Sequence, residues 1–367
     1  MPFYSPHTFY FPQNVVQSNC ILYFDRMKRK PGLPIFGDLM KMGLLGMVVI
    51  LPLAWIAGQE FHWALAPFAF ALGVLVGWIE LVLFRKLFTD ISLPVSLIGK
   101  VVFYYVGTIL LSLVFSIPIE VYIERNKTIS QVLSEISDLD NLLNMIKIIP
   151  VIMVMVLYLQ IETLVGKGMF SKYLGGAYYQ PAVQERVFMF VDMMDSTALA
   201  ERFGDRVYYR FLNKFIRNMS RAIYESGGEI YKYMGDEVIV SWRVRKRTKV
   251  DKMIATVFNI YQQIEEEKPR YMQEFGSFPK FRASMHMGDV ICAQIGDLKK
   301  EIAYNGDVVN TASRMQKVVK EYRERFIISE ALFQKMDNKD RYEIRDLGKV
   351  RIPGKSQEIG MRILKIR

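Results

Sequence analysis

The stretch Glu185–Trp242, ERVFMFVDMMDSTALAERFGDRVYYRFLNKFIRNMSRAIYESGGEIYKYMGDEVIVSW, decides the fold of the C-terminal half of the chain. An apolar run, 187–191, ends in Asp192, a long amphipathic segment follows, and two further apolar runs flank the turn at Gly235-Asp236. This order predicts a strand, a helix and a β-hairpin. If the first two strands are neighbours, Asp192 and Asp236 lie side by side, and two carboxylates at a sheet edge suit Mg²⁺.

The rest of this half continues the alternation of strands and helices. We expect a helix at about 251–274, strands at 281–288 and 290–295, a helix from about Asp307, and a last α/β portion that ends at 361–366. The whole is a βαββαβ pattern with additions, which predicts an α+β fold of the ferredoxin-like kind, a sheet with its helices on one face.

The composition favours a membrane protein. The chain has 367 residues, 51% of them hydrophobic, and a net charge of +11, with a mean hydropathy of +0.14. A basic balance can indicate nucleic-acid binding, but here the Lys and Arg residues cluster beside apolar segments, which favours a membrane protein and no nucleic-acid partner. The two cysteines, Cys20 and Cys292, imply no disulfide framework.

Four apolar segments precede the C-terminal half, and each can cross the ~30 Å hydrocarbon layer, the first only just. They run at approximately 42–58, 62–84, 95–119 and 143–165. We therefore expect an N-terminal cytoplasmic segment at 1–34, a transmembrane domain with four helices at 35–165, and a linker at 166–184.

The charges of the loops predict the orientation. Basic residues lie at Arg26–Lys30 and at Arg85-Lys86, whereas the loop 120–141 is rich in acidic residues. The excess of Lys and Arg on the cytoplasmic side of membranes then places both termini inside and the acidic loop outside. We expect an integral protein of the cell (inner) membrane, in contact with the lipid bilayer and open to an unknown membrane or extracytoplasmic ligand.

Two features of the apolar half leave alternatives open. Glu80 lies within the second segment, where a carboxylate is either functional or close enough to the interface to reach it. Lys100 is expected to extend toward the interface. Gly73 and Gly77, four residues apart, serve either helix packing within one chain or contacts between two chains.

Three blocks of the C-terminal half together resemble a known family. They are FVDMMDST, then GGEIYKYMGDEV, then YNGDVVNTASR at 304–314. In this order they are similar to the signature blocks of the class III nucleotidyl cyclases, over roughly 186–364. The resemblance implies a cyclase catalytic domain at 185–367, a homodimer with ATP as substrate, and two Mg²⁺ or Mn²⁺ ions per active site.

The resemblance assigns the metal ions to Asp192 and Asp236, with the backbone carbonyl of Met193 as an additional ligand. The nearby Asp195, Ser196 and Thr197 instead indicate a helix start, where such side chains accept backbone N–H bonds.

The resemblance assigns the substrate to three positions. Lys232 stands where the family's adenine-contacting lysine stands, since an ammonium can donate to N1 of adenine but not to the N1–H of guanine. Ala303 stands where the family usually has Asp or Thr, so one base contact is lost. Pro353 replaces the lysine that holds the terminal phosphates, and Lys355 nearby is the substitute.

The resemblance assigns Asn310 and Arg314 to the transition state. They are four residues apart, hence on one helix face. In this family one subunit supplies the metal ligands and the other supplies Lys, Asn and Arg, so a homodimer with both sets has two equivalent sites.

We expect a membrane-bound adenylate cyclase that makes 3′,5′-cyclic AMP and pyrophosphate and is regulated through its membrane domain. A guanylate cyclase is the alternative within enzymes: Lys232 argues against it, and Ala303 leaves it open. An alternative of another class is a receptor-like signalling module with an inactive cyclase domain. The complete set of Asp192, Asp236, Asn310 and Arg314 argues against that module.

Overall fold

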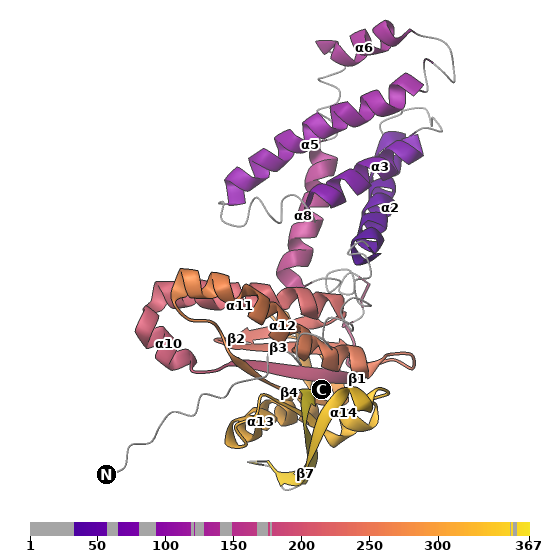
Figure 1. Ribbon diagram of the computed structural model, residues 1–367. Helices are drawn as coiled ribbons and strands as arrows, with labels where there is room; N and C mark the ends of the chain where they lie inside the picture. The colour runs from indigo at the N-terminus through magenta and orange to yellow at the C-terminus, as the bar shows by residue number, and fades with distance from the viewer. Residues whose placement is uncertain are drawn as a thin grey trace. The chain divides into compact units, whose positions relative to one another are not determined.

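The chain forms two compact units, Met1–Gln160 and Ile161–Arg367, in the computed structural model (Figure 1). Each unit is described by itself. The structure describes residues 33–56, 65–80, 93–118, 121, 128–139, 149–166, 175–176, 178–352, 354 and 358–367.

The N-terminal unit is helical in its described parts. Gly46 of α2 and Gly73 of α3 bring these two helices close together, because a Cβ atom on Gly73 would lie 2.2 Å from the carbonyl oxygen of Met42. These glycines therefore pack two helices of one chain. The helices are α2 (Leu33–Ile56), α3 (Leu65–Trp78), α5 (Leu93–Ser116), α6 (Ile129–Ser137) and α8 (Ile149–Val165).

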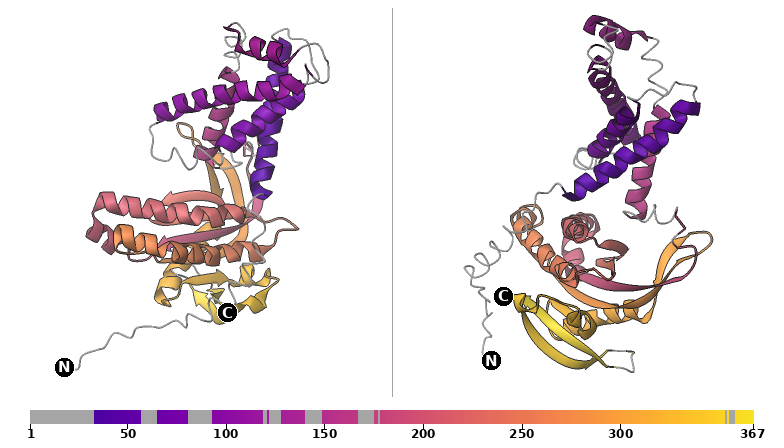
Figure 2. Two further views of the ribbon diagram at one scale, coloured as in Figure 1. Left: turned by 45° about the horizontal axis from the view of Figure 1, so that its top comes forward. Right: turned by 90° about the vertical axis from the view of Figure 1, so that its right-hand side faces the viewer.

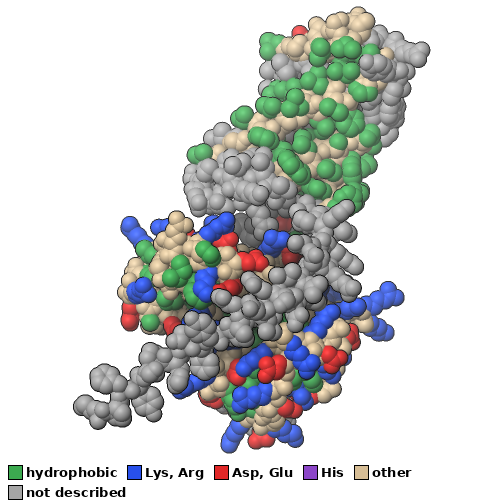
Figure 3. All heavy atoms as spheres, viewed as in Figure 1, with side chains coloured by type: hydrophobic (Ala, Val, Ile, Leu, Met, Phe, Trp, Pro, Cys, Tyr) green, Lys and Arg blue, Asp and Glu red, His purple; other side chains and the backbone are tan. Residues whose placement is uncertain are grey.

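The predicted four-helix transmembrane domain is not supported by the described residues. Within them, no helix combines the length and the apolar character that crossing a bilayer requires. Helix α3 has 14 residues and α8 has 17, whereas a span needs about 20. Hydrophobic side chains nevertheless cover much of the visible face of this unit (Figure 3).

A buried polar cluster links α3 to α5. The ammonium of Lys100 lies 2.9 Å from Glu80, and the hydroxyl of Tyr104 donates to the same carboxylate at 2.9 Å. The side chain of Lys100 is 9% exposed. The sequence led us to expect that Lys100 extends toward the interface, and the structure shows this side chain buried beside Glu80: buried charges are stable when they are paired, and Glu80 supplies the partner.

The C-terminal unit is built on a mixed sheet with the strand order β2-β3-β1-β4-β6-β8-β7, and β5 pairs with β4. The predicted α+β class is confirmed here. The strands are β1 (Ala182–Met193), β2 (Glu229–Met234), β3 (Glu237–Arg243), β4 (Phe281–Ile295), β5 (Glu301–Asn305), β6 (Phe326–Ser329), β7 (Tyr342–Arg351) and β8 (Glu358–Ile366).

Helices cover both faces of this sheet, not one face as the pattern predicted (Figure 2). Successive side chains of a strand point to opposite faces. On β1, Val187 and Met189 pack with α11 and α12, whereas Phe188 packs with α13. The helices are α10 (Ser196–Phe203), α11 (Asp205–Glu225), α12 (Val250–Phe275), α13 (Asp307–Glu321), α14 (Glu330–Gln334) and the 3₁₀ turn η4 (Lys339–Arg341).

The strand order and two element boundaries differ from the simplest reading of the sequence. The condition that β1 and β2 are neighbours is not met, because β3 lies between them. The long helix predicted after β1 is instead two helices, α10 and α11, which are separated by Gly204. The φ of Gly204 is 73°, a value that glycine adopts readily. The two strands expected after α12 are one strand, β4, and the short strand β5 was missed.

Arg186 lies at the centre of a buried polar network on β1. Its side chain is 1% exposed, and its guanidinium donates to Ser241 at 2.6 Å and to Glu229 at 2.8 Å. It also stacks over the ring of Tyr304 from β5, 4.3 Å from the ring centroid. One buried cation thus ties β1, β3, β2 and β5 together.

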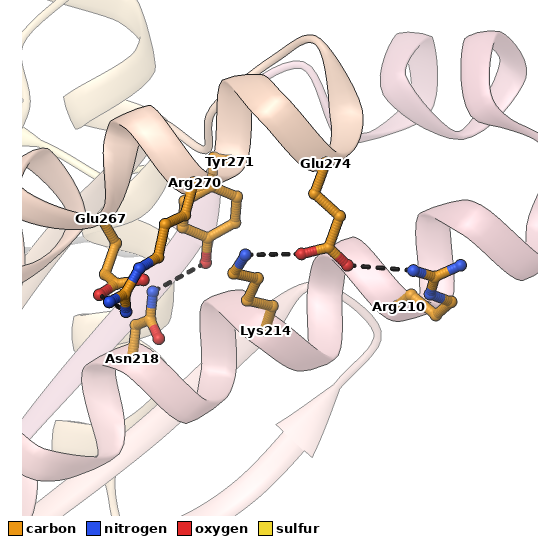
Figure 4. Close-up of polar contacts among 7 residues, drawn as sticks. All are labelled: Arg210, Lys214, Asn218, Glu267, Arg270, Tyr271 and Glu274. Atoms are coloured by element: carbon orange, nitrogen blue, oxygen red, sulfur yellow. Dashed lines mark hydrogen bonds and ion pairs between the residues drawn. The ribbon is translucent and has the colours of Figure 1, made fainter.

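An exposed polar network joins α11 to α12 (Figure 4). Glu274 accepts from Arg210 at 3.0 Å and from Lys214 at 2.7 Å, and Asn218 donates to Tyr271 at 3.1 Å. Arg210 is 65% exposed. Such surface pairs contribute about 0–1 kcal/mol.

Arg186→Met should lower the free energy of unfolding of the C-terminal unit by about 3 kcal/mol, because it leaves the carboxylate of Glu229 without its buried partner. Arg210→Met, the matched exposed control, should cost less than about 1 kcal/mol. Urea unfolding can be followed by the fluorescence of Trp242, with the chain's other three tryptophans replaced by Phe. Equal effects of the two substitutions would contradict the assigned role of Arg186.

Candidate active site

Three carboxylates gather where β1 ends and the β2–β3 hairpin turns. Asp192 lies opposite Glu237 in the register of β1 and β3, and Asp236 precedes Glu237 in the turn. The two aspartates are thus brought together through β3, although β1 and β2 do not pair. The predicted juxtaposition of Asp192 and Asp236 arises by a different route from the one that the sequence suggested.

Burial and the neighbouring negative charges disfavour the charged form of Glu237 in this cluster. Burial, followed by the negative charges of Asp192 and Asp236, raises the pKa of Glu237 from 4.5 to about 7. Burial and the charge of Asp236 also raise the pKa of Tyr208 on α11. Neighbouring carboxylates whose charges oppose one another attract a cation.

Asp192 has one buried oxygen without a hydrogen-bond partner in the described part of the chain. The ammonium of Lys320, in the last turn of α13, lies 2.9 Å from this atom, Oδ2, but out of line for a hydrogen bond. The Asp192 side chain is 14% exposed and that of Lys320 is 52% exposed. A buried acceptor with no hydrogen bond is an oxygen that a metal ion could take.

The oxygen atoms of these side chains are suitable ligands for Mg²⁺ or Mn²⁺. Both are hard cations that prefer oxygen donors and keep positions open for water and phosphate. Among the described residues, no group of three or more His, Cys, Asp or Glu side chains converges on one point. Two carboxylates, completed by substrate oxygens, are the arrangement that Mg²⁺ uses.

Asp195 does not cap α10 in the expected way. The helix begins at Ser196, as expected, but Asp195 has a left-handed backbone (φ 58°) and its side chain accepts no capping hydrogen bond. Its backbone carbonyl accepts from the N–H of Leu199 instead. Met193 is the last residue of β1, and its side chain is buried.

Helix α13 runs along β1 on the face opposite α11. Val308, near its start, lies against Gly288, the register partner of Arg186 near the beginning of β1. Gln316, further along, donates to the carbonyl of Phe190 at 2.6 Å. Lys320 then reaches Asp192, so the helix passes from the beginning of β1 to its end.

This path separates Asn310 and Arg314 from the carboxylates of the same chain. At 1.5 Å per residue, Asn310 is roughly 15 Å from Lys320 along the helix axis and Arg314 is about 9 Å away. Asn310 is exposed, and Arg314 donates to the carbonyl of Gly354 at 2.6 Å. Within one chain, Asn310 and Arg314 therefore lie apart from the carboxylates predicted to bind metal.

Lys232 lies on β2 and Ala303 lies on β5, and side chains of these two strands contact each other. The rings of Tyr231 on β2 and Tyr304 on β5 are in contact, with their centroids 4.8 Å apart. The pKa of Glu301 is lowered first by a hydrogen bond from Lys299 and also by the charge of Lys232. Glu301 and Ala303 are two apart and share a face of β5. Lys232 and Ala303 therefore belong to one neighbourhood.

The remaining predicted substrate residue, Lys355, lies outside the described residues, as does Pro353. Sequence reasoning missed Glu237, Lys320 and Glu301. Glu237 had a usable signal, since it directly follows Asp236 at the start of a strand. Lys320 and Glu301 had none, because their positions depend on how α13 and β5 pack.

Comparisons with known proteins identify the family. The sequence profile described as "Adenylate and Guanylate cyclase catalytic domain" matches residues 178–365. The chain belongs to this family. The match begins just before β1 and covers the C-terminal sheet, so the unit that carries the carboxylate cluster is a cyclase catalytic domain.

Several relatives are similar over this part of the chain. Adenylate cyclase 2 of Rhizobium meliloti (strain 1021) is 32% identical over 207 residues, which are 56% of this chain and 57% of that protein. The adenylate cyclase of Anabaena cylindrica is 24% identical over 186 residues, 49% of this chain and 36% of that protein. The chain thus matches less than two thirds of the length of each of these relatives.

A solved structure shows the same fold. A bacterial light-regulated adenylyl cyclase aligns with a TM-score of 0.50 and 18% identity, over 62% of this chain and 66% of that chain.

Glu237→Gln should stabilise the metal-free protein at high pH and change little at pH 4.5. The folded-state pKa of about 7 exceeds the ordinary 4.5, so the folded state binds the proton more tightly and the wild type loses stability as pH rises between these values. Since the side chain is partly exposed, we expect a gain of about 1 kcal/mol at pH 8. Thermal melts at both pH values measure it. A variant equally or less stable than wild type at pH 8 would contradict the conclusion that burial and neighbouring charges disfavour the Glu237 carboxylate.

Proposed function

We propose that this protein is an adenylate cyclase, which converts ATP into 3′,5′-cyclic AMP and pyrophosphate. Family membership and the names of the relatives in Rhizobium meliloti and Anabaena cylindrica support this activity. The observation that carries the proposal is the cluster of Asp192, Asp236 and Glu237, with a buried oxygen of Asp192 that accepts no hydrogen bond from the described residues and lies beside the ammonium of Lys320.

The reaction makes modest demands on the protein. The ribose 3′-hydroxyl attacks the α-phosphorus of its own nucleotide, so the nucleophile is already tethered. The chain must hold the triphosphate in line and stabilise the charge that develops on its oxygens. Two Mg²⁺ or Mn²⁺ ions, held by Asp192, Asp236 and the carbonyl of Met193, would lower the pKa of the hydroxyl and bind the β- and γ-phosphates.

The proposed site is shared between two copies of the chain. Asn310 of a second copy would orient the ribose, and Arg314 would donate to the α-phosphate. The distance along α13 supports this division, because one chain cannot bring these residues to its own carboxylates without moving the helix. A two-fold homodimer then has two equivalent sites.

The preference for ATP rests on Lys232. Its ammonium can donate to N1 of adenine, whereas the N1–H of guanine offers no acceptor. The Ala303 side chain supplies no hydrogen bond to the base, and Glu301, on the same face of β5, is a polar group that senses the charge of Lys232. GTP is the alternative substrate, and turnover of GTP above ATP would assign this chain as a guanylate cyclase.

A non-catalytic receptor-like module is the alternative of a different class. It predicts binding without turnover. The presence of both carboxylates together with Asn310 and Arg314 favours catalysis.

We also propose that the N-terminal unit associates with a lipid bilayer and passes a signal from an unknown ligand to the cyclase domain. Exposed apolar side chains on its helices support this, including Val48 (69%), Val114 (65%) and Leu110 (59%). Full-length protein should stay with the membrane fraction after a carbonate wash at high pH. Complete release into the supernatant would count against integral attachment.

Purified full-length protein with Mn²⁺ should form cyclic AMP from ATP faster than cyclic GMP from GTP. Asp236→Ala should reduce the rate at least about 100-fold, because it removes a ligand of the ions that stabilise the transition state. Asp340→Ala, which removes an exposed carboxylate of the same unit, is the matched control and should leave the rate unchanged. Normal turnover by Asp236→Ala, or no product from either nucleotide, would contradict the proposal.

A further inference from the structure

Lys320 occupies the place where the proposed metal ion would bind. Its ammonium lies 2.9 Å from Oδ2 of Asp192, the buried oxygen that accepts no hydrogen bond from the described residues. An ammonium and a metal ion compete for the same charge on the same oxygen. Among the described residues, Lys320 is the cation that pairs with Asp192.

The charge of Lys320 also acts on the neighbouring carboxylate. Glu237 is the register partner of Asp192 and directly follows Asp236, so the ammonium at Asp192 lies beside a cluster of acidic groups. One ammonium therefore offsets part of the repulsion among three acidic groups in the chain without metal. Without a counter-ion, two or three carboxylates in a partly buried site are unfavourable.

The position of Lys320 allows its ammonium to move away from Asp192 easily. It belongs to the last turn of α13, and its side chain is 52% exposed. A lysine has a flexible four-carbon stem, and its ammonium is readily hydrated. The pair with Asp192 can break without unfolding the helix, since Gln316 and Ser284 hold α13 to the sheet through separate hydrogen bonds.

We propose that Lys320 is a placeholder cation: it pairs with Asp192 in the metal-free chain and must leave when the metal ion binds. This rests on the proposed role of Asp192 as a metal ligand. Lys320 is a residue that sets metal affinity, not a catalytic residue. The consequence is that the site binds metal weakly without nucleotide, because each binding event must break an existing ion pair.

The test is Mn²⁺ binding to the full-length, nucleotide-free protein, with free Mn²⁺ measured by electron paramagnetic resonance. Lys320→Met keeps the apolar stem and removes the charge, and it should tighten Mn²⁺ binding roughly fivefold or more. Lys320→Gln is a second neutral variant with the same expectation. Lys320→Arg keeps the charge and should bind like wild type.

Lys317→Met is the matched control. Lys317 is exposed on the same helix one turn earlier, so its loss changes the net charge equally without touching Asp192, and Mn²⁺ affinity should stay within about twofold of wild type. The proposal is overturned if Lys320→Met and Lys320→Gln bind Mn²⁺ no more tightly than wild type. It is equally overturned if Lys317→Met or Lys320→Arg tightens binding as much as they do.

Asp192→Asn separates this inference from the function on which it rests. If Asp192→Asn loses the Mn²⁺ site and the neutral Lys320 variants bind Mn²⁺ more tightly, the metal assignment and the placeholder role are both supported. If Asp192→Asn loses the site but the Lys320 variants do not change it, only the placeholder role fails. If Asp192→Asn binds Mn²⁺ as wild type does, the metal assignment itself fails, and the placeholder role fails with it.

Discussion

The packing of α13 along β1 is the constraint on which the active site depends. The helix is fixed to the sheet by Gln316, which donates to the carbonyl of Phe190, and by Ser284, which donates to the carbonyl of Ala312. These bonds connect buried groups, so sliding the helix would leave buried polar atoms without partners. The helix therefore keeps Lys320 at Asp192 and keeps Asn310 away from it. A site that needs both must draw them from two chains.

The electrostatics of the same end of β1 supports the proposal that it holds a cation. The edge of the sheet concentrates three carboxylates, and burial raises the pKa of Glu237 to about 7. Such a site is costly when empty and favourable when occupied by a divalent ion. If the proposed metal site is correct, stability and function are coupled there, because the repulsion among these carboxylates in the absence of metal would be the source of their attraction for it. Elsewhere the buried charge of Arg186 is paired with Glu229 and hydrogen-bonded to Ser241, and its role is to stabilise the sheet.

The sequence predicted what local patterns determine. The hairpin and the positions of Asp192 and Asp236 followed from apolar runs that end in turns, and helical spacing placed Asn310 and Arg314 on one helix face, whereas the roles of these residues came from the family resemblance. What it could not predict depends on contacts between distant segments: the insertion of β3 between β1 and β2, the placement of α13 on the second face, and the pairing of Lys320 with Asp192. In the N-terminal half, hydropathy alone predicted four membrane spans that the described helices do not support.

The most direct test of the shared site is complementation between two inactive chains. Asp236→Ala removes a proposed metal ligand and Arg314→Ala removes the group proposed to contact the α-phosphate, so each homodimer would lack one function in both sites. A mixed dimer has one site in which every group is intact. Co-purified mixed dimers should recover cyclic AMP formation at about half the wild-type rate per dimer. Mixed dimers that form but remain inactive would show that each site is built within a single chain.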